Sequence, residues 1–464
     1  MIKKIFTVLI LMYSGILLNA QTNQMPNVIY IMADDLGYGD VGFNGQTKIM
    51  TPNIDRIAKE GIVFNNHYAG STVCGPSRAV LMTGMHTGHC SVRENPKWTK
   101  SGTAVDLSLN DVTVAEEMKK AGYVTGMVGK WGLAETLGDG MPNKQGFDFF
   151  YGFNRHSAAH HYYPDSIWYN EKHVRIEGNV MEKKQGKYSH NIFTDETLKF
   201  IKRNKEKPFF FYVAYTIPHY ELTIAEKEKS QYYAKNWPLR KMKSGHYLHD
   251  ENGHVTYASM VTKMDEDIGR IMQELKDLGL DDKTLVIFTS DNGHEYDKVN
   301  NEFFNSNGKF RGKKRDLYEG GIHMPFAARW PGKINPGTTS DLLTTFWDFL
   351  PTMCDLAGVK PTAKIDGISY LSTLLGKDKK QKKHDYLYWE FNERQGPVQA
   401  VRKEEWKAVK YKNKPIELYN LEKDIGETNN IASDYPKIVK EMTEIISNAR
   451  TENSEFPLEV IKKH

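Results

Sequence analysis

Cysteine is scarce in this chain, which has only Cys74, Cys90 and Cys354 among its 464 residues. Exported proteins often have paired cysteines, and an odd number leaves at least one thiol outside any pairing. The composition therefore excludes a fold built on a disulfide framework. It also draws attention to Cys74, which is followed by Gly75 and Pro76 in a stretch that predicts an exposed turn opening a helix.

Long apolar runs are missing after residue 20, which excludes a membrane span in the mature chain because a span needs about 20 apolar residues. At the start, Lys3 and Lys4 precede an apolar stretch from Ile5 to Leu18, and Ala20 can precede a cleavage point. This pattern predicts a secretory signal peptide over residues 1–20 and a periplasmic or secreted protein. The alternative is a membrane anchor, for which the apolar run is short. A lipoprotein anchor is not indicated, since no cysteine lies nearby.

A strong excess of one charge is also missing, because 62 Lys and Arg residues face 58 Asp and Glu residues, a net charge of +4. This balance does not indicate a nucleic-acid partner. Internal repeats and extended low-complexity segments are absent as well. The length predicts one large domain and a smaller one, or two to three domains.

Strand and helix patterns alternate through most of the chain. Buried strands are expected at 27–32, at 123–130, at 208–219 and at 284–294, and helices at 51–61, 112–120, 257–278 and 346–356. Thr51 is the expected N-cap of the first helix, with Pro52 at its first position. The alternation predicts an α/β fold whose large, mostly parallel sheet has helices on both faces. We assign residues 21–380 to this domain.

The pattern changes toward the C-terminus, where short strands of alternating character are expected at 385–391, 400–411 and 416–421, with a final helix at 435–449. These elements predict a smaller antiparallel α+β subdomain over residues 381–464. The basic stretch from Gly376 to Asp385 is interpreted as a solvated linker between the two parts.

Four of the expected strands end in polar residues. They are Asp34 and Asp35, Lys130, His219, and Asp291 with Asn292. The carboxyl ends of parallel strands meet at one edge of a sheet, so these residues are expected in one crevice. Carboxylate and amide oxygens are hard ligands that suit Ca²⁺. The alternative is that Asp34 and Asp35 only cap a loop.

The segment from Cys74 to Arg78, followed by Leu81-Met82-Thr83-Gly84, resembles the signature of the type I sulfatases, which have the alkaline-phosphatase-like fold. In that family a separate formylglycine-generating maturation enzyme oxidises the cysteine to formylglycine. The aldehyde adds water, one hydroxyl of the resulting diol attacks sulfur, and the other expels sulfate by collapse to the aldehyde. A serine would form a stable sulfate ester with no such exit.

The resemblance also implies roles for the other residues. One calcium ion is held by Asp34, Asp35, Asp291 and Asn292 together with the group made from Cys74. Arg78 holds the diol, and Asp291 accepts its proton. Lys130 neutralises a sulfate oxygen. His219 protonates the leaving oxygen with help from Lys314, which lies in a segment close to the family pattern. The neighbouring Lys309, Arg311, Lys313 and Arg315 are interpreted as surface charges.

The sequence departs from the family at Gly132, where members often have a histidine that assists the collapse. The segment from Arg155 to Asn170 supplies His156, His160 and His161, and we expect His160, then His161, to replace the missing group. The same segment contains Tyr162, Tyr163 and Trp168, which either line a glycan subsite or pack in the core.

These observations predict a secreted sulfatase that hydrolyses sulfate monoesters of a carbohydrate. The segment from Gln145 to Pro164 resembles bacterial sulfatases assigned to galactose or N-acetylgalactosamine sulfates, similar to arylsulfatases and N-acetylgalactosamine-6-sulfatases. One alternative is a phosphonate or phosphodiester hydrolase of the same superfamily. Another is a non-catalytic protein that binds sulfated glycans and keeps Cys74 unmodified.

Overall fold

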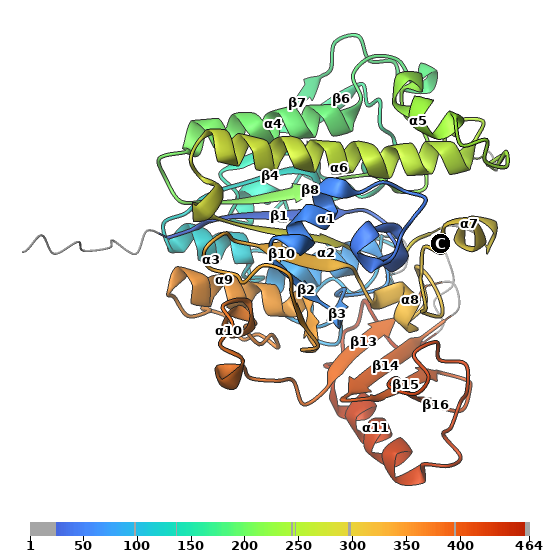
Figure 1. The fold of residues 1–464 in the computed structure, drawn as a ribbon. Coiled ribbons are helices and arrows are strands. Elements are labelled where there is room, and N and C mark those ends of the chain that lie inside the picture. The colour runs from blue at the N-terminus through green and yellow to red at the C-terminus, as the bar shows by residue number, and fades with distance from the viewer. Residues whose placement is uncertain are drawn as a thin grey trace, which may run out of the picture.

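The computed structural model describes residues 25–96, 99–135, 137–242, 245, 247–295, 298–393 and 396–459, without the side chains of 298–300. The predicted signal peptide, residues 1–20, lies outside these ranges. Within them, no helix has the length and apolar character that crossing a membrane requires. Figure 1 shows a large sheet between two layers of helices and, below it, a small C-terminal sheet with one helix.

The large sheet has ten strands in the order β11-β2-β10-β9-β1-β8-β4-β5-β6-β7. Its centre, from β9 to β5, is entirely parallel, whereas β10 and the β6–β7 hairpin run antiparallel to their neighbours. The predicted fold class, an α/β protein with a mostly parallel sheet, is confirmed. The strands are β1 (Asn27–Ala33), β2 (Ile62–Phe64), β4 (Val124–Lys130), β5 (Phe149–Phe153), β6 (Ser166–Tyr169), β7 (Lys172–Arg175), β8 (Phe209–Ala214), β9 (Thr284–Ser290), β10 (Phe326–Arg329) and β11 (Thr338–Ser340).

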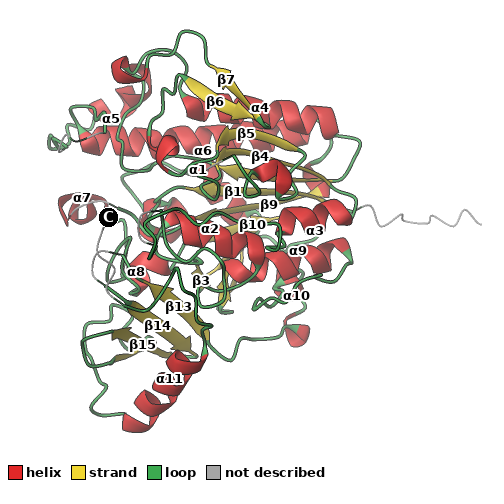
Figure 2. Ribbon diagram, turned by 180° about the vertical axis from the view of Figure 1, so that it is seen from behind, coloured by secondary structure: helices red, strands yellow, loops and turns green. Residues whose placement is uncertain are grey.

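Both faces of this sheet are covered by helices, with α1, α4 and α6 on one side and α2, α3 and α9 on the other (Figures 1 and 2). Alternate residues of β1 point into the two cores: Tyr30 and Met32 into one, Ile29 and Ile31 into the other. Burial on both faces explains why the central strands are continuous apolar runs. The helices are α1 (Pro52–Lys59), α2 (Cys74–Thr83), α3 (Val114–Lys120), α4 (Ser189–Asn204), α5 (Ser230–Tyr233), α6 (Gly253–Asp277), α7 (Lys298–Phe304), α8 (Glu319–Ile322), α9 (Phe349–Ala357), α10 (Leu371–Leu374) and α11 (Pro436–Asn448).

The C-terminal sheet is antiparallel, in the order β13 (Leu387–Phe391), β14 (Val398–Lys403), β15 (Trp406–Tyr411) and β16 (Glu417–Asn420). Its two faces are buried differently. Tyr388 and Val401 pack with α11, whereas Trp389 and Ala400 belong to the core of the large domain. The strands β3 (His67–Tyr68) and β12 (Thr344–Thr345) form a separate two-stranded sheet. The small sheet therefore shares a core with the large domain.

Several expected elements differ from the observed ones. The strand predicted at 400–411 is a hairpin of two strands, which turns at Glu404 with a left-handed φ of 52°. The strand predicted at 208–219 ends at Ala214, so His219 lies on the loop after it. Thr51 precedes α1 as expected, but its side chain accepts from Gly42 N–H at 2.8 Å instead of capping the helix. In the expected linker, His384 is half-buried and its Nε2 lies 2.7 Å from Asp348 Oδ1, whereas its neighbours Lys383 and Asp385 are exposed as expected.

Candidate functional site

The residues that follow the central strands lie at one edge of the sheet. Asp34 and Asp35 come directly after β1, Lys130 is the last residue of β4, and Asp291 comes directly after β9. Because β9, β1, β8 and β4 are adjacent and parallel, their carboxyl ends meet at this edge. The structure therefore brings together the side chains that the sequence singled out.

Three carboxylates form the centre of the site. Asp34, Asp35 and Asp291 are fully buried, and one oxygen from each lies within 4.8 Å of the others. Burial raises the pKa of Asp35, against the opposing effect of Lys314, and also raises the pKa of Asp291.

Asn292 completes this group. Its Nδ2 donates to Asp35 Oδ1 at 2.7 Å, while its buried Oδ1 has no hydrogen-bond partner among the described residues. A buried amide oxygen without a donor is costly unless a cation or water meets it. Carboxylate and amide oxygens prefer hard divalent cations, so Asp34, Asp35, Asp291 and Asn292 fit such an ion.

Two cations pair with the carboxylates on the β4 side. Lys130 Nζ lies 3.0 and 2.7 Å from the two oxygens of Asp34. The Arg78 guanidinium donates to Asp291 Oδ2 through Nε at 3.2 Å and Nη2 at 2.7 Å, and through Nη1 to the Lys130 carbonyl at 2.5 Å. All four side chains are buried, so their pairs are shielded from solvent. This arrangement fixes Asp291 and Lys130 relative to each other.

A second cluster lies beside the first. Asp35, His219 and Glu295 offer ligand atoms within 4.8 Å of one another. However, the Lys314 ammonium lies among them, 2.7 Å from Asp35 Oδ2 and 3.1 Å from Glu295 Oε2. Burial and the neighbouring His160 hold the pKa of His219 well below its ordinary value, so the imidazole is neutral. In this second cluster, the Lys314 ammonium therefore occupies the place that a metal ion would take.

The ionic groups balance before any ligand is added. Glu295 also binds Arg315 Nη1 at 2.7 Å, and Lys314 and Arg315 lower the pKa of Glu295 to about 2 despite its burial. The carboxylates are Asp34, Asp35, Asp291 and Glu295, and the cations are Arg78, Lys130, Lys314 and Arg315. A divalent cation would make the site net positive, which favours an anionic substrate.

Cys74 is the first residue of α2, as the sequence predicted, but it is not on an exposed turn, because only 2% of its surface is accessible. Burial raises the pKa of its thiol, which makes the unmodified side chain a weak nucleophile. Its Sγ lies 3.9 Å from Asn95 Oδ1, which also accepts from Gly75 N–H at 3.0 Å. A Cβ at Gly75 would lie 2.6 Å from that oxygen, so a larger residue at this position would displace the Asn95 side chain.

The other residues of the motif also have structural partners. Ser77 Oγ donates to the Asp291 carbonyl at 2.6 Å and accepts from Gly70 N–H at 3.1 Å. Arg78 binds the carboxylate of the same aspartate. The motif thus attaches the first turn of α2 directly to the loop after β9, and this attachment fixes Cys74 beside the carboxylates.

The histidines of the segment after β5 occupy different places. His160 stacks on His219, with ring centroids 4.2 Å apart. His161 Nδ1 is bound to Glu221 Oε2 at 2.8 Å. His156 lies over Gly132, where an added Cβ would be 3.5 Å from the His156 Cβ. Of the three, His156 is nearest to the glycine that replaces the family histidine.

The possible glycan subsite at Tyr162 and Tyr163 is excluded, because both side chains are buried in the core. Tyr162 OH donates to the His219 carbonyl at 2.8 Å, so this residue supports the site from behind. Trp168 is partly buried and packs against His173 of the β6–β7 hairpin. The alternative, core packing, is the observed one for the two tyrosines.

Among the four expected surface charges, Arg315 was assigned wrongly. Its side chain is only 18% exposed and reaches Glu295. Arg311 is exposed but lies over the Tyr318 ring and donates to Tyr419 OH at 3.1 Å. Sequence reasoning also missed Glu295 and Asn95. The only available signal for Glu295 was its position three residues after Asn292 on the same loop.

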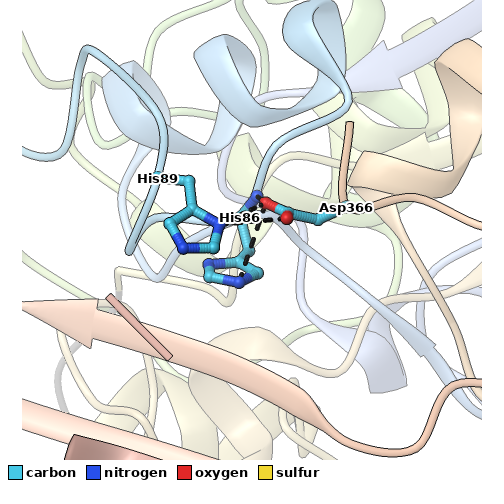
Figure 3. Close-up of side chains that lie close together, drawn as sticks. All are labelled: His86, His89 and Asp366. Carbon is cyan, nitrogen blue, oxygen red and sulfur yellow. Dashed lines mark hydrogen bonds and ion pairs between the residues drawn. The ribbon is translucent and has the colours of Figure 1, made fainter. Parts of the chain in front are cut away.

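A third cluster, outside this site, joins the loop after α2 to the loop after α9 (Figure 3). His89 Nδ1 lies 2.9 Å from Asp366 Oδ1, and His86 Nε2 lies 3.7 Å from Asp366 Oδ2. Gly88 N–H donates to His86 Nδ1 at 3.1 Å, so the neutral ring has its proton on Nε2. That tautomer directs an N–H toward Asp366, which makes this cluster a hydrogen-bonded connection between the two loops.

Comparisons with known proteins agree with this geometry. A family model described as Sulfatase matches residues 26–359, and one described as N-sulphoglucosamine sulphohydrolase, C-terminal, matches residues 308–452. An N-acetylgalactosamine-6-O-sulfatase of Bacteroides thetaiotaomicron is 29% identical, with 93% of this chain and 94% of that protein covered. Human arylsulfatase A is 30% identical, with 88% and 83% covered.

Solved structures show the same relationship. The crystal structure of Ps i-CgsB in complex with k-i-k-neocarrahexaose has a TM-score of 0.76 and 29% identity, covering 92% of this chain and 93% of that one. A phosphonate monoester hydrolase of Agrobacterium radiobacter shares the fold, with a TM-score of 0.64 and 21% identity over 90% of this chain and 94% of that one. The match of the sulfatase model across most of the chain, together with the likeness to arylsulfatase A, shows that the chain belongs to the sulfatase family.

Proposed function

We propose that this protein is an exported, calcium-dependent sulfatase that hydrolyses sulfate monoesters of carbohydrates with a formylglycine made from Cys74. The observation that supports this most is the place of Cys74 at the buried start of α2, beside three carboxylates and their cations. A buried thiol with a raised pKa is a poor nucleophile as it stands, whereas an aldehyde at the same position gives a diol.

A divalent cation would be held by Asp34, Asp35, Asp291 and Asn292. When bound, such an ion lowers the pKa of a hydroxyl next to it and so makes it a stronger nucleophile. The ligand atoms are all oxygens, which favours Ca²⁺. The orphaned Oδ1 of Asn292 supports the assignment, because a cation would satisfy it.

The remaining residues act on charge and protons. Asp291 accepts the proton of the attacking hydroxyl as its oxygen bonds to sulfur, and Arg78 keeps that carboxylate in place. Lys130 and Lys314 offset the charge of the sulfate. The Lys314 ammonium supplies the proton of the leaving oxygen as the bond from sulfur breaks, and the neutral His219 donates a hydrogen bond to that oxygen. Asp291, Arg78, Lys130 and Lys314 are already held by hydrogen bonds, so little reorganisation of these groups accompanies the reaction.

The second half of the reaction needs an acceptor for the proton of the other hydroxyl. As that proton leaves, the C=O bond forms and the bond to the sulfate oxygen breaks, which releases sulfate. The expected acceptor was His160, then His161. We now assign the role to His156, because it lies over Gly132 and its Nδ1 faces Glu135 Oε1 at 3.3 Å, which leaves the Nε2 lone pair available.

The substrate class rests on the relatives. One is an N-acetylgalactosamine-6-O-sulfatase, and Ps i-CgsB was crystallised with a neocarrahexaose. We therefore propose galactose or N-acetylgalactosamine sulfates as substrates. Export follows from the predicted signal peptide, and maturation would require a formylglycine-generating enzyme in the host.

The decisive experiment is mass spectrometry of the tryptic peptide that ends at Arg78, prepared from protein made in its own host. Conversion predicts a loss of about 18 Da relative to the cysteine form, because CH₂SH becomes CHO. Cys74→Ala provides the inactive control for turnover of an aryl sulfate. An unmodified thiol, with sulfated sugars bound but not hydrolysed, would instead support the glycan-binding alternative.

The same preparation tests the alternative that the protein is a phosphonate or phosphodiester hydrolase. Sulfate esters and phosphodiesters with the same leaving group should be compared at equal enzyme concentration. Faster hydrolysis of the phosphodiester would move the assignment to the phosphonate and phosphodiester hydrolases that share this fold.

A further inference from the structure

Four half-buried aromatic rings surround the outer side of His219. They belong to His160, Tyr220, Tyr247 and His249. The Tyr247 ring is central, with its centroid 5.9 Å from that of His160, 6.2 Å from His219 and 5.4 Å from Tyr220. His249 lies 5.8 Å from Tyr247 and 5.3 Å from Tyr220. We call these four residues the aromatic wall.

The wall is assembled from three loops. His160 follows β5, Tyr220 follows β8, and Tyr247 and His249 belong to the segment between α5 and α6. These loops are unrelated in sequence, yet their rings converge beside one buried histidine. Such convergence next to a reacting group is the usual arrangement of a ligand subsite.

The backbone behind Tyr247 is held on both sides. Leu248 N–H donates to Glu221 Oε2 at 2.9 Å, and Asp250 N–H donates to the Leu222 carbonyl at 2.8 Å. Asp250 is further paired with Lys229 at 2.9 Å. The segment is thus attached to the loop after β8, which also positions His219. A ring fixed in this way loses little conformational entropy when a ligand binds.

Charge divides the site into two regions. Lys130 and Lys314 form a cationic floor at the carboxylates, whereas the wall consists of tyrosine and histidine rings. Burial and the nearby Glu295 carboxylate raise the pKa of Tyr247, so its phenol remains neutral. Aromatic faces bind apolar surface, and their polar edges form hydrogen bonds. A ligand that matches both regions has one anionic group attached to an uncharged ring.

We propose that Tyr247, together with His160 and Tyr220, forms the subsite that stacks on the uncharged sugar ring to which the sulfate ester is attached. A pyranose of galactose configuration suits this wall, since its C3–H, C4–H and C5–H bonds share one face. The proposal rests on the proposed sulfatase function and deepens it by naming the residues that select the alcohol part of the substrate.

The test uses Tyr247→Ala and Tyr247→Phe, with Tyr233→Ala as the control, because Tyr233 is an exposed tyrosine of α5 outside the wall. Galactose and N-acetylgalactosamine sulfates are assayed first on the parent enzyme to choose the best substrate. The KM of that substrate should rise about tenfold in Tyr247→Ala, a loss typical of one aromatic contact, and stay near the parent value in Tyr247→Phe. Inorganic sulfate, which meets only the cationic floor, should keep its inhibition constant in every variant.

The possible outcomes distinguish failure of the proposed subsite from failure of the proposed sulfatase function. An unchanged KM in Tyr247→Ala overturns the subsite, as does an equal rise in KM and in the inhibition constant of sulfate. Turnover of an aryl sulfate without turnover of any of these sugars overturns the substrate class. Absence of turnover on aryl sulfates as well, with residue 74 unmodified, would refute the sulfatase function itself.

Discussion

At the scale of single residues, the pair formed by Glu135 and His156 gives the proposed base a fixed orientation. Arg155 Nε and His156 Nδ1 both bind the Glu135 carboxylate, and these hydrogen bonds lower the pKa of Glu135 to about 2 although its burial acts against them. Burial and the ammonium groups of Lys130 and Lys314 lower the pKa of His156 despite Glu135. The imidazole is therefore neutral and able to accept a proton.

Replacement of His156 by alanine should slow the release of sulfate more than the release of the alcohol. We expect a burst of phenol from an aryl sulfate, followed by steady turnover reduced about 100-fold or more, as for loss of a general base. Intact-mass measurement should show an adduct of about 80 Da, the sulfated enzyme. His161→Ala is the matched control because His161 is bound to Glu221. Loss of the burst together with turnover would contradict this role.

Some residues of the site could be predicted from the sequence and others could not. Asp34, Asp35 and Asp291 could be found because each follows a buried strand directly, and strand ends of a parallel sheet converge. Glu295 and Arg315 could not be found in this way. Their roles depend on how the loop after β9 meets the loop before α8, and neither loop has a periodic pattern that predicts its course.

At the scale of elements, the small sheet is attached to the catalytic loop by a buried ion network. Lys407 of β15 is fully buried, with Nζ 2.7 Å from Glu319 Oε1 and 3.0 Å from Glu427 Oε1. Glu319 opens α8, five residues after Lys314, and its Oε2 accepts from Tyr68 OH at 2.6 Å. The C-terminal sheet thus fixes the end of the segment that places Lys314 in the site.

Lys407→Met should strongly destabilise the protein, because it removes the nearest ammonium group from the buried carboxylates of Glu319 and Glu427. Breaking a buried pair in this way costs about 3–5 kcal/mol. Lys403→Met on the neighbouring strand is the control, since its pair with Glu441 is exposed and worth at most about 1 kcal/mol. Urea unfolding of both variants at pH 7.5 measures the difference. Equal midpoints for the two variants would show that the network does not join the two parts.

Element boundaries were harder to predict than element types. The hairpin of β14 and β15 was expected as one strand, because its turn at Glu404 and Glu405 contains no glycine, proline or asparagine. Glutamate takes the left-handed conformation there against its own preference. Packing of both faces of the small sheet, on α11 and on the large domain, compensates for this cost and is invisible in the local sequence.

At the scale of the whole molecule, the alternation of strands and helices in the sequence predicted the architecture. It did not predict that the small C-terminal sheet shares a core with the large domain. The interior of the protein contains neutral histidines as well as apolar side chains. Burial lowers the pKa of His67, His86, His190 and His294, to about 4 for His86 and about 3 for His294. Such groups make the folded state sensitive to acid, because the unfolded chain binds protons that the folded chain excludes.

Replacement of His86 tests this sensitivity to acid. Its ordinary pKa is about 6.5, so below that pH the unfolded chain takes up a proton that the folded chain refuses until the pH reaches about 4. The stabilisation is present above pH 6.5 and is lost as the pH falls toward 4, by up to about 3 kcal/mol. His86→Gln should therefore lose less stability than the parent between pH 6.5 and 4.5. Urea unfolding at fixed calcium concentration measures both curves, with the exposed His173→Gln as control. Parallel curves for His86→Gln and the parent would mean that His86 takes up its proton equally in both states, and that the acid sensitivity arises at the other buried histidines.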